Sequence, residues 1–346
     1  MNDHPLRIEV LVNSPGPHDQ VRIREPFKAL QQQGLDCRIH ERPFRFSSCI
    51  RPHSLVIWQR PLPESRQRQW EHLQWLRERG CLLLTEWDDH PDLFPEPIQT
   101  PLRAIALAPL QLCHALHTSS PRLANALRPL QPLALVLENS IAQLPPLDLA
   151  KHTRPPLRLL IANQNRSGEH QAISQALAEW AKADPSLQLV VIGDRALAQR
   201  LPAHQLEFHP TLPYQHYRAV LASCQIALLP LEATEANACK TPIKLLECAA
   251  ASVATVCGPG LYSLWAPAGV TRLVTGLEQV VPEARSLAEN PAERRGLVAR
   301  AHSWVGQQWQ LQGQLPWRLW LYQELWRRRR AVDARLVERI NAYPAL

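Results

Sequence analysis

Residues 225–262 place two lysines where they could bind a phosphorylated ligand. The apolar run 226–231 predicts a buried strand, and a polar loop leads from it into a helix for which Thr241 is the expected N-cap. Lys240 stands at the start of this helix and Lys244 in its first turn. Free N–H groups and the positive end of the helix dipole favour an anion there. The two lysines strengthen that preference.

Glu247 adds a second candidate contact, three residues after Lys244 and on the same helix face. From Thr241 to Glu247 the helix rises roughly 9 Å, at ~1.5 Å per residue. This span could carry a diphosphate at the helix tip and a ribose diol at the carboxylate. Pro242 suits the first helical position, where its missing N–H costs nothing. The alternative is a solvated Lys–Glu pair on an ordinary surface helix, which the spacing alone also fits.

A second group of polar residues follows a predicted strand at 81–85. Residues 86–92 contain four acidic groups and a histidine, at the carboxyl end of a strand, where open α/β sheets bind ligands. Asp88, Asp89 and His90 are therefore candidate catalytic residues. The alternative is a loop in which Asp and Pro only form turns and cap helices. No second cluster supplies partners for a metal ion, so no metal site is expected.

Strands and helices alternate along two runs of the chain, which predicts an α/β protein with two mostly parallel sheets facing across a cleft. In the first run, strands are expected at 6–12, 35–40, 55–59, 81–85, 115–118 and 134–138, and helices at 21–33, 63–79, 101–112 and 121–130. In the second run, strands are expected at 157–162, 187–192, 206–209, 226–231 and 270–274, and helices at 170–181 and 214–223. The proline-rich residues 141–156 read as a linker. The expected domains are thus 1–140 and 157–312, followed by a C-terminal helix at 313–346.

The composition fits a globular protein of about two domains, since 346 residues with 45% hydrophobic content can bury two cores. The eight cysteines form no C-x-x-C pair and are expected to be reduced core residues. No leader or membrane-length apolar run is visible, so the cytoplasm is the expected location. The net charge of +7 is the only feature that suggests nucleic acid, and no recognition motif accompanies it. No nucleic-acid partner is expected.

The C-terminal segment combines tryptophans with a block of four arginines, residues 327–330. Trp317, Trp320 and Trp326 precede that block. Such a helix could make peripheral contact with an anionic membrane. Alternatively, its apolar side chains pack across the two domains and leave the arginines in solvent.

Several segments of this chain resemble a family of enzymes. In the second half they are LRLLIANQN, LQLVVIGD, EFHPTLPYQHYRAVLASCQIALLPL and KTPIKLLECAAASVATV. In the first half LVIWQRP, TEWDDHPDLF, HTSSPRLANAL and LVLENSI match more loosely. These segments resemble GT-B fold glycosyltransferases, in particular the large retaining group (family 4-like) that uses nucleotide sugars. Lys240, Lys244 and Glu247 match the lysine-rich K-x-x-x-K-x-x-E pattern of one branch.

The resemblance implies two Rossmann-like domains, with the donor bound by the second and the acceptor by the first. Glu247 would hold the ribose hydroxyls, and Lys240, Lys244 and Arg166 would face the diphosphate. The donor-binding positions that it marks are Asn165, Arg166, Gly193, Asn237, Lys240, Thr241, Lys244 and Glu247. The acceptor-side loop would contain Asn13 and Gly16, near Asp88, Asp89 and His90.

The implied reaction moves a sugar from a nucleoside-diphosphate sugar to a saccharide, lipid or protein acceptor. Helix N–H groups and lysines can stabilise the leaving diphosphate, so neither a metal nor a cofactor is expected. Three departures bear on this activity: Cys239 stands where many members have a second glutamate, Ser252 replaces a glycine after the donor helix, and the first loop has one glycine, Gly16. The alternative is a catalytically inactive GT-B module that acts as a binding or scaffold protein.

Overall fold

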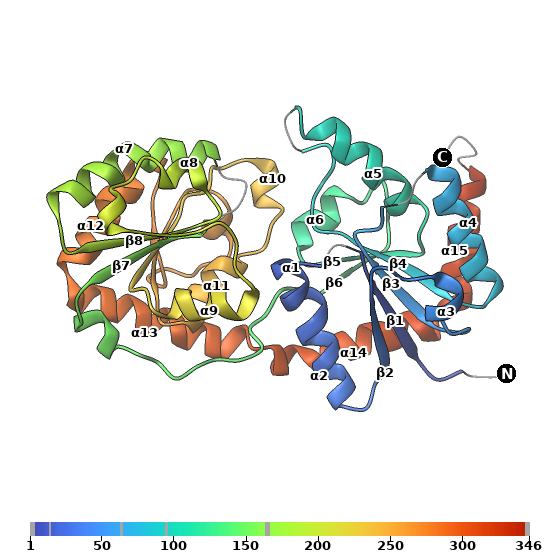
Figure 1. The fold of residues 1–346 in the computed structure, drawn as a ribbon. Coiled ribbons are helices and arrows are strands. Elements are labelled where there is room, and N and C mark those ends of the chain that lie inside the picture. Colours follow the sequence, from blue (N-terminus) through green and yellow to red (C-terminus); the bar gives the residue numbers. More distant parts are fainter. Residues whose placement is uncertain (1–3, 14, 63–64, 94–95, 163–166, 343–346) are drawn as a thin grey trace. The chain divides into compact units, whose positions relative to one another are not determined.

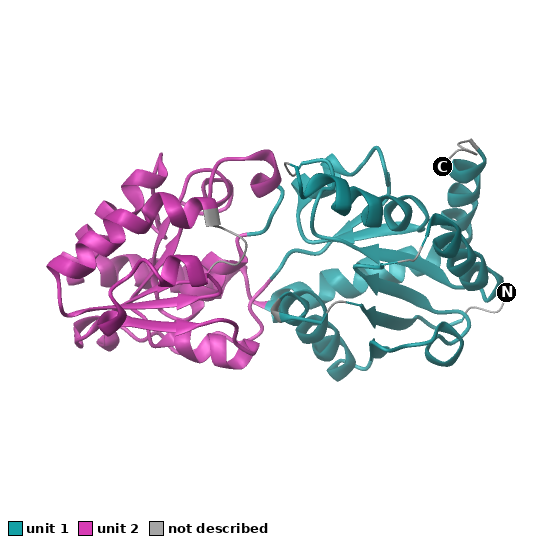
Figure 2. Ribbon diagram, turned by 45° about the horizontal axis from the view of Figure 1, so that its top comes forward, with its two compact units in different colours: residues 1–139, 239–241, 311–346 teal, residues 140–238, 242–310 magenta. Residues whose placement is uncertain are grey.

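The computed structural model describes residues 4–13, 15–62, 65–93, 96–162 and 167–342. The chain divides into two compact units (Figure 2). The first unit comprises residues up to 139, 239–241 and from 311 onward, and the second comprises 140–238 and 242–310. Each unit contains a six-stranded parallel sheet with helices on both faces (Figure 1). The predicted α/β class with two parallel sheets is confirmed.

The sheet of the first unit has the strand order β2-β1-β3-β4-β5-β6. Its strands are β1 (Arg7–Val12), β2 (Asp36–Glu41), β3 (Leu55–Gln59), β4 (Leu82–Glu86), β5 (Ala115–Thr118) and β6 (Ala134–Val136). The helices are α1 (Pro17–Asp19), a π-helical turn (Gln20–Arg24), α2 (Glu25–Gln32), α3 (Phe46–Cys49), α4 (Arg66–Glu78), α5 (Gln99–Gln111) and α6 (Pro121–Ala126). Every residue of β3 and β4 is buried, as expected for a parallel sheet covered on both faces.

The second sheet has the order β12-β11-β10-β7-β8-β9. Its strands are β7 (Leu157–Ile161), β8 (Leu187–Ile192), β9 (Leu206–His209), β10 (Ile226–Leu229), β11 (Ala254–Cys257) and β12 (Arg272–Leu273). The helices are α7 (Ser167–Ala183), α8 (Arg195–Ala198), α9 (Tyr214–Ala222), α10 (Glu235–Ala238), α11 (Ile243–Ala250), α12 (Val280–Glu289) and α13 (Pro291–Gln308). Leu159 and Leu160 of β7 enter separate apolar clusters. Both faces of this sheet are therefore packed.

Residues 141–156, the expected linker, group with the second unit and contain one 3-10 turn, Ala150–Thr153. The buried Lys151 in this turn donates hydrogen bonds to the carbonyls of Ala222, at 2.9 Å, and Ala251, at 2.7 Å. These carbonyls end α9 and α11, where a helix dipole favours a cation. Burial lowers the pKa of Lys151 to about 8. The segment thus stabilises the ends of two helices as well as connecting them to the rest of the chain.

The C-terminal segment, expected as one helix at 313–346, forms two: α14 (Leu311–Arg327) and α15 (Arg329–Ala342). Both group with the first unit. The Tyr322 hydroxyl and the Nε2 atom of His117 at β5 are 2.8 Å apart, and Arg77 of α4 pairs with Asp333 of α15 at 2.6 Å. Among the described residues, no helix is both long and apolar enough to span a bilayer.

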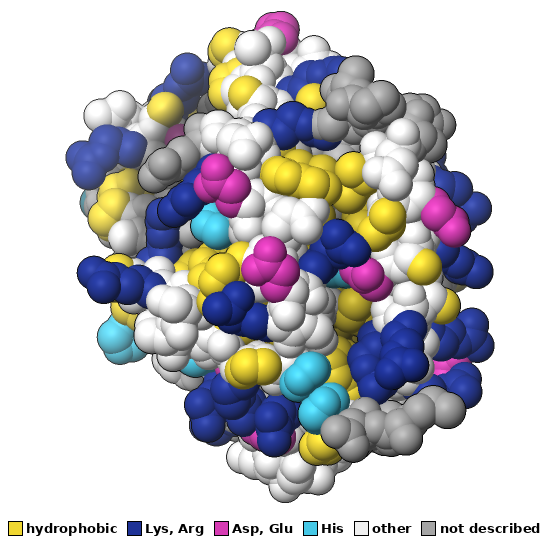
Figure 3. Space-filling model, turned by 90° about the vertical axis from the view of Figure 1, so that its right-hand side faces the viewer, with side chains coloured by type: hydrophobic (Ala, Val, Ile, Leu, Met, Phe, Trp, Pro, Cys, Tyr) yellow, Lys and Arg dark blue, Asp and Glu magenta, His cyan; other side chains and the backbone are white. Residues whose placement is uncertain are grey.

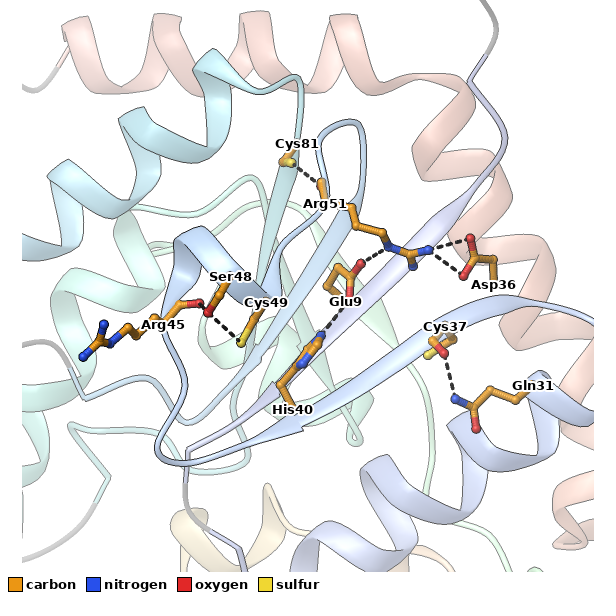
Figure 4. Close-up of polar contacts among 10 residues, drawn as sticks. All are labelled: Glu9, Gln31, Asp36, Cys37, His40, Arg45, Ser48, Cys49, Arg51 and Cys81. Atoms are coloured by element: carbon orange, nitrogen blue, oxygen red, sulfur yellow. Dashed lines mark hydrogen bonds and ion pairs between the residues drawn. The ribbon is translucent and has the colours of Figure 1, made fainter.

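A carboxylate lies fully buried within β1, at Glu9 (Figure 4). Its oxygens contact the Nε atom of Arg51 and the Nε2 atom of His40 on β2, the latter at 2.8 Å. Arg51 also reaches both carboxylate oxygens of Asp36, at 2.8 and 2.9 Å. The buried charge is thus compensated by neighbours. These contacts fix β2, the edge strand, beside β1.

Candidate functional site

Helix α11 begins one residue later than predicted. Pro242 occupies the N-cap position with φ −79° and ψ 26°, so Ile243 is the first helical residue and the assignment of the N-cap to Thr241 is wrong. The Thr241 hydroxyl instead accepts a hydrogen bond from the Asn139 amide at 2.7 Å, within the first unit. The helix start carries no side-chain cap. Its first N–H groups are therefore not satisfied by a capping side chain.

Glu247 is buried on α11, with only 7% of its surface exposed. The Tyr217 hydroxyl of α9 donates a hydrogen bond to Glu247 Oε2 at 2.9 Å, and Lys244 Nζ lies 3.5 Å from the same oxygen. Lys244 Nζ also lies 4.1 Å from the centre of the Tyr217 ring, a cation–π contact. Glu247 is therefore not part of a solvated surface pair. Burial and the charge of Glu247 raise the pKa of Tyr217 well above its ordinary value, so the hydroxyl keeps its proton.

Tyr217 was not among the predicted site residues. It precedes Glu247 by 30 positions and lies on a different helix, so no spacing rule connects the two. From the sequence one could predict only that a tyrosine lies on the helix before β10, and not which residue it contacts. Tyr217, Lys244 and Glu247 form what we call the α11 triad.

Lys240 and Lys244 belong to different units. Residues 239–241 group with the first unit, and Lys240 Nζ lies 2.7 Å from Asp89 Oδ1 there. Lys244 contacts Glu247 in the second unit. The structure thus pairs Lys240 with one of the predicted catalytic residues, Asp89.

Gly193 and Asn237, two further donor-side predictions, belong to the second unit. Gly193 follows β8 with φ +93°, a left-handed conformation that favours glycine, and its N–H donates to the His209 carbonyl at 2.9 Å. Asn237 is buried on α10, where its amide donates to the Glu232 carbonyl at 3.0 Å. Both residues shape the backbone around the strand ends. Asn165 and Arg166 lie outside the described residues.

The first unit carries a group of five charged residues at the carboxyl ends of β3 and β4, which we call the carboxyl-edge cluster: Arg22, Arg60, Glu86, Asp88 and Asp89. Arg60 binds both carboxylate oxygens of Asp88, at 2.8 and 2.7 Å, and Arg22 contacts the same carboxylate. Burial alone would raise the pKa of Asp88, but Arg22 and Arg60 outweigh it and hold the pKa well below its usual range. Asp88 therefore remains ionised and is a weak proton acceptor.

Glu86 differs from Asp88 although the two are near neighbours in sequence. It is 1% exposed, and its contact with Arg22 Nε, at 3.1 Å, only partly compensates for burial. Burial raises the pKa of Glu86, while Arg22 opposes the rise. The cluster thus combines one firmly ionised carboxylate with one that holds its proton more tightly.

His90, Asn13 and Gly16 also lie at this edge of the first sheet. His90 uses both ring nitrogens on backbone groups: Nε2 faces the Ala126 carbonyl at 3.2 Å, and Nδ1 accepts from the Asp92 N–H at 3.1 Å. The Asn13 amide donates to the Arg60 carbonyl at 2.8 Å. These contacts give His90 and Asn13 a role in fixing loops.

His18 is a residue that the sequence analysis missed. It lies in α1, the helix after β1, and its Nε2 atom is 3.2 Å from the Gln59 amide nitrogen. A Cβ atom on Gly16 would lie 2.9 Å from the His18 ring, so Gly16 makes room for it. Burial, with the positive charges of Arg22 and Arg60, lowers the pKa of His18 to about 4. Only its position after a predicted strand could have marked His18 as a site residue, because a single histidine forms no motif with a recognisable spacing.

Two of the three departures have structural explanations. Cys239 is 2% exposed and packs in an apolar cluster of the first unit with Trp87 and Leu123. Ser252 follows α11 in the left-handed conformation, with φ +56°, where glycine is usual. Its hydroxyl accepts a hydrogen bond from the Asp148 N–H at 3.0 Å. Ser252 thus acts in the turn that ends α11.

Within the part of the chain that the structure describes, no three His, Cys, Asp or Glu residues are grouped so that they could hold an ion.

The two parallel six-stranded sheets with flanking helices match solved GT-B glycosyltransferases. HepE from Anabaena, solved with UDP and glucose, superposes with a TM-score of 0.61 at 11% identity, over 92% of this chain and all of HepE. The pneumococcal O-GlcNAc transferase GtfA, solved with UDP and GlcNAc, gives a TM-score of 0.55 at 14% identity, over 81% of this chain and 58% of GtfA. A variant of TarM from S. aureus, solved with UDP and two saccharide ligands, gives 0.57 at 7% identity, over 78% and 55%. At these identities the likeness shows a shared GT-B fold.

In sequence, residues 166–315 match a protein-family model described as Glycosyl transferase-like. The match covers less than half of the chain and includes the whole α11 triad. No curated protein matches the chain in sequence.

Proposed function

We propose that this protein is a glycosyltransferase that moves a sugar from a nucleoside-diphosphate sugar to an acceptor hydroxyl. The observation that carries the proposal is the buried Glu247 carboxylate on α11, the second helix after β10, inside the segment that matches the glycosyl transferase-like model. A carboxylate accepts several hydrogen bonds, and the contacts of Tyr217 and Lys244 described above are both with Oε2. The hydroxyls of a ribose would supply further donors. UDP in the three GT-B structures compared above supports uridine as the nucleoside of the donor.

In this proposal the α11 triad binds the nucleotide. Glu247 accepts hydrogen bonds from the ribose diol, because an ionised carboxylate only accepts. Tyr217 holds Oε2 and orients the group. Lys244 and the uncapped N–H groups of α11 face the diphosphate. Lys240 and Thr241, with Asn165, Arg166, Gly193 and Asn237, remain proposed donor-side residues.

The transfer itself needs stabilisation of the leaving group more than a protein nucleophile. As the bond between the sugar anomeric carbon and the diphosphate oxygen breaks, negative charge grows on the diphosphate, and lysines and helix N–H groups offset it. In a retaining reaction the acceptor oxygen bonds to the anomeric carbon from the same face. Its proton passes to the departing diphosphate. No metal or cofactor is required by this scheme.

We assign the acceptor to the first unit, at the loop of Asn13 and Gly16, at His18 of α1 and at the carboxyl-edge cluster. Asp88 is held ionised by two arginines and His90 bonds to backbone groups at both nitrogens, so we propose that Asp88, Asp89 and His90 shape this loop. A saccharide acceptor fits the alternating positive and negative side chains, which match a neutral polyol. Lipid-linked and protein-linked hydroxyls carry the same reacting group.

The test is UDP binding by calorimetry to wild type and to matched variants. Glu247→Gln removes the charge and half of the accepting capacity, and we expect UDP affinity to fall at least about tenfold, the equivalent of ~1.4 kcal/mol. Tyr217→Phe keeps the ring beneath Lys244 but frees Oε2, and we expect a several-fold loss. Glu289→Gln changes an exposed glutamate of the same unit and serves as the control. Wild-type affinity in Glu247→Gln would refute the donor site.

The second candidate is a GT-B module that binds the nucleotide sugar without transferring it. Cys239 favours it, because this position is packed in an apolar cluster where many glycosyltransferases of the resembled group present a glutamate. The two candidates separate in a product assay with UDP-glucose and UDP-GlcNAc against saccharide and lipid acceptors. UDP-sugar binding with no product across that panel would favour the binding module.

A further inference from the structure

Two tryptophans stand out on the surface of the first unit. Trp317 is 54% exposed and Trp320 49% exposed, and their rings stack with centroids 4.8 Å apart. The remaining nine of the 11 tryptophans are buried or half-buried. Large aromatic surface in water is costly, so a stacked exposed pair calls for an explanation beyond chance.

The packing of α14 against the rest of the first unit does not explain why Trp317 and Trp320 are exposed. The helix buries its opposite face, on which Leu315, Tyr322 and Trp326 are each 5% exposed or less. Trp326 Nε1 donates to the His4 carbonyl at 2.9 Å, and Tyr322 meets His117. These contacts fix the helix, and Trp317 and Trp320 lie outside them.

The exposed face of α14 is apolar at its start and basic at its end. At about 100° per residue, Gly313, Pro316, Trp317, Trp320 and Arg327 fall on one side of the helix, and all five are exposed. By the same rule Glu324 lies on this side as well, and Arg327 and Arg328 both pair with it. The exposed Arg330 and Arg335 follow on α15. The stripe thus runs from an apolar start to a charged end at which arginines outnumber the one glutamate.

We propose that the first unit binds the surface of an anionic lipid bilayer through Trp317 and Trp320. The indole rings enter the boundary between headgroups and acyl chains, where their apolar bodies and polar N–H groups are both accommodated. The arginines that follow lie against acidic headgroups. Contact is peripheral, and the bilayer is not crossed. This inference is independent of whether the α11 triad binds a nucleotide.

The exposed area argues against a second copy of the chain as the occupant. Each half-exposed indole offers roughly 100 Å², about half the surface of an aromatic side chain. A stable protein interface needs about 800 Å² per partner. Binding to an anionic lipid surface does not require a protein interface of that size.

The charge of the surface around α15, the helix that follows α14, agrees with an acidic lipid partner. Figure 3 shows the end of the first unit that carries α4 and α15, where Lys and Arg side chains outnumber acidic ones. The whole chain has a net charge of +7. An anionic leaflet attracts basic side chains near its surface, and salt screens this attraction.

The test is flotation of the full-length protein with vesicles of phosphatidylcholine and phosphatidylglycerol, at a ratio of about two to one, and with vesicles of phosphatidylcholine alone. We expect wild type to float with the anionic vesicles and to be released by salt. The double variant Trp317→Gln with Trp320→Gln should lose at least about tenfold in vesicle affinity. The control Leu264→Gln, which removes an equally exposed apolar side chain of the second unit, should float as wild type does.

Circular dichroism of the double variant checks that folding is unchanged, as expected for two exposed positions. Flotation of the double variant equal to wild type would overturn the proposal, as would a wild type that fails to float. Light scattering tests whether a second copy of the chain covers the tryptophans instead. A wild type that forms a dimer and does not bind vesicles, with a double variant that is monomeric, would also overturn the proposal. UDP binding should be the same in all of these variants, which separates this outcome from failure of the donor site.

Discussion

Ser252 shows how one residue can depart from a common pattern and still serve the same turn. A left-handed conformation costs a non-glycine residue about 1–2 kcal/mol. Here the hydroxyl accepts a hydrogen bond from the Asp148 N–H, worth about 1 kcal/mol. The free-energy cost of the backbone strain and the stabilisation by the hydrogen bond therefore nearly cancel. Substitution of glycine by serine in this turn is therefore compatible with an intact α11.

The prediction is an order of stabilities at position 252. Ser252→Gly removes both the strain and the hydrogen bond, so we expect a free energy of unfolding within about 1 kcal/mol of wild type. Ser252→Ala keeps the strain and leaves the Asp148 N–H without its acceptor, and should lose about 1–2 kcal/mol. Urea unfolding of the three proteins measures this order. A glycine variant less stable than the alanine variant would contradict it.

The residues that matter most in the candidate sites were only partly visible in the sequence. Lys244 and Glu247 could be predicted because both lie on one helix, three positions apart. Tyr217 could not, since it meets Glu247 from another helix. His18 and Glu9 were missed for a similar reason: their surroundings come from strands that meet only in the folded sheet.

At the scale of elements, long apolar runs were enough to predict the central strands. The strands and helices that were not predicted have local explanations. Strand β11 was not predicted because residues 254–257 follow the apolar α11 with no glycine or proline between them. Ser252 makes that turn without the usual glycine. The short helices α3 and α10, of four residues each, carry too little periodicity to be recognised.

Helix α14 depends on a histidine whose protonation should destabilise its docking. Burial lowers the pKa of His117 to about 3, against an ordinary value of 6.5. Between these two values the unfolded chain binds more protons at this site than the folded chain. The stability contributed by neutral His117 is thus fully present above pH of about 6.5 and is lost as pH falls toward 3.

Thermal unfolding as a function of pH measures this effect. We expect the melting temperature of wild type to fall steadily below pH of about 6.5. His18 and His152, whose pKa values burial lowers to about 4, contribute in the same direction. His117→Gln cannot charge, so its melting temperature should fall less steeply over the same range. If the melting temperatures of the two proteins fell equally with pH, protonation of His117 would not be what destabilises the packing of α14.

For the whole molecule, the alternation of strands and helices was enough to predict two sheets. It could not predict how distant segments join them. Residues 239–241 leave the second unit and group with the first, and α15 reaches α4 through Arg77 and Asp333, which are 256 residues apart. Such contacts leave no periodic trace, because each partner is locally an ordinary surface residue.

The division into two units leads to a prediction for ligand-linked stability. If UDP binds the α11 triad, it stabilises the second unit by mass action, by about 2.7 kcal/mol at a concentration of 100 times its Kd. Asp333→Asn weakens the contacts of α15 with Arg77 and His114, and so destabilises the first unit. In scanning calorimetry we expect Asp333→Asn to lower one unfolding transition and UDP to raise the other. Equal movement of a single transition under both changes would mean that the two units unfold together, because contacts in one would then determine the stability of both.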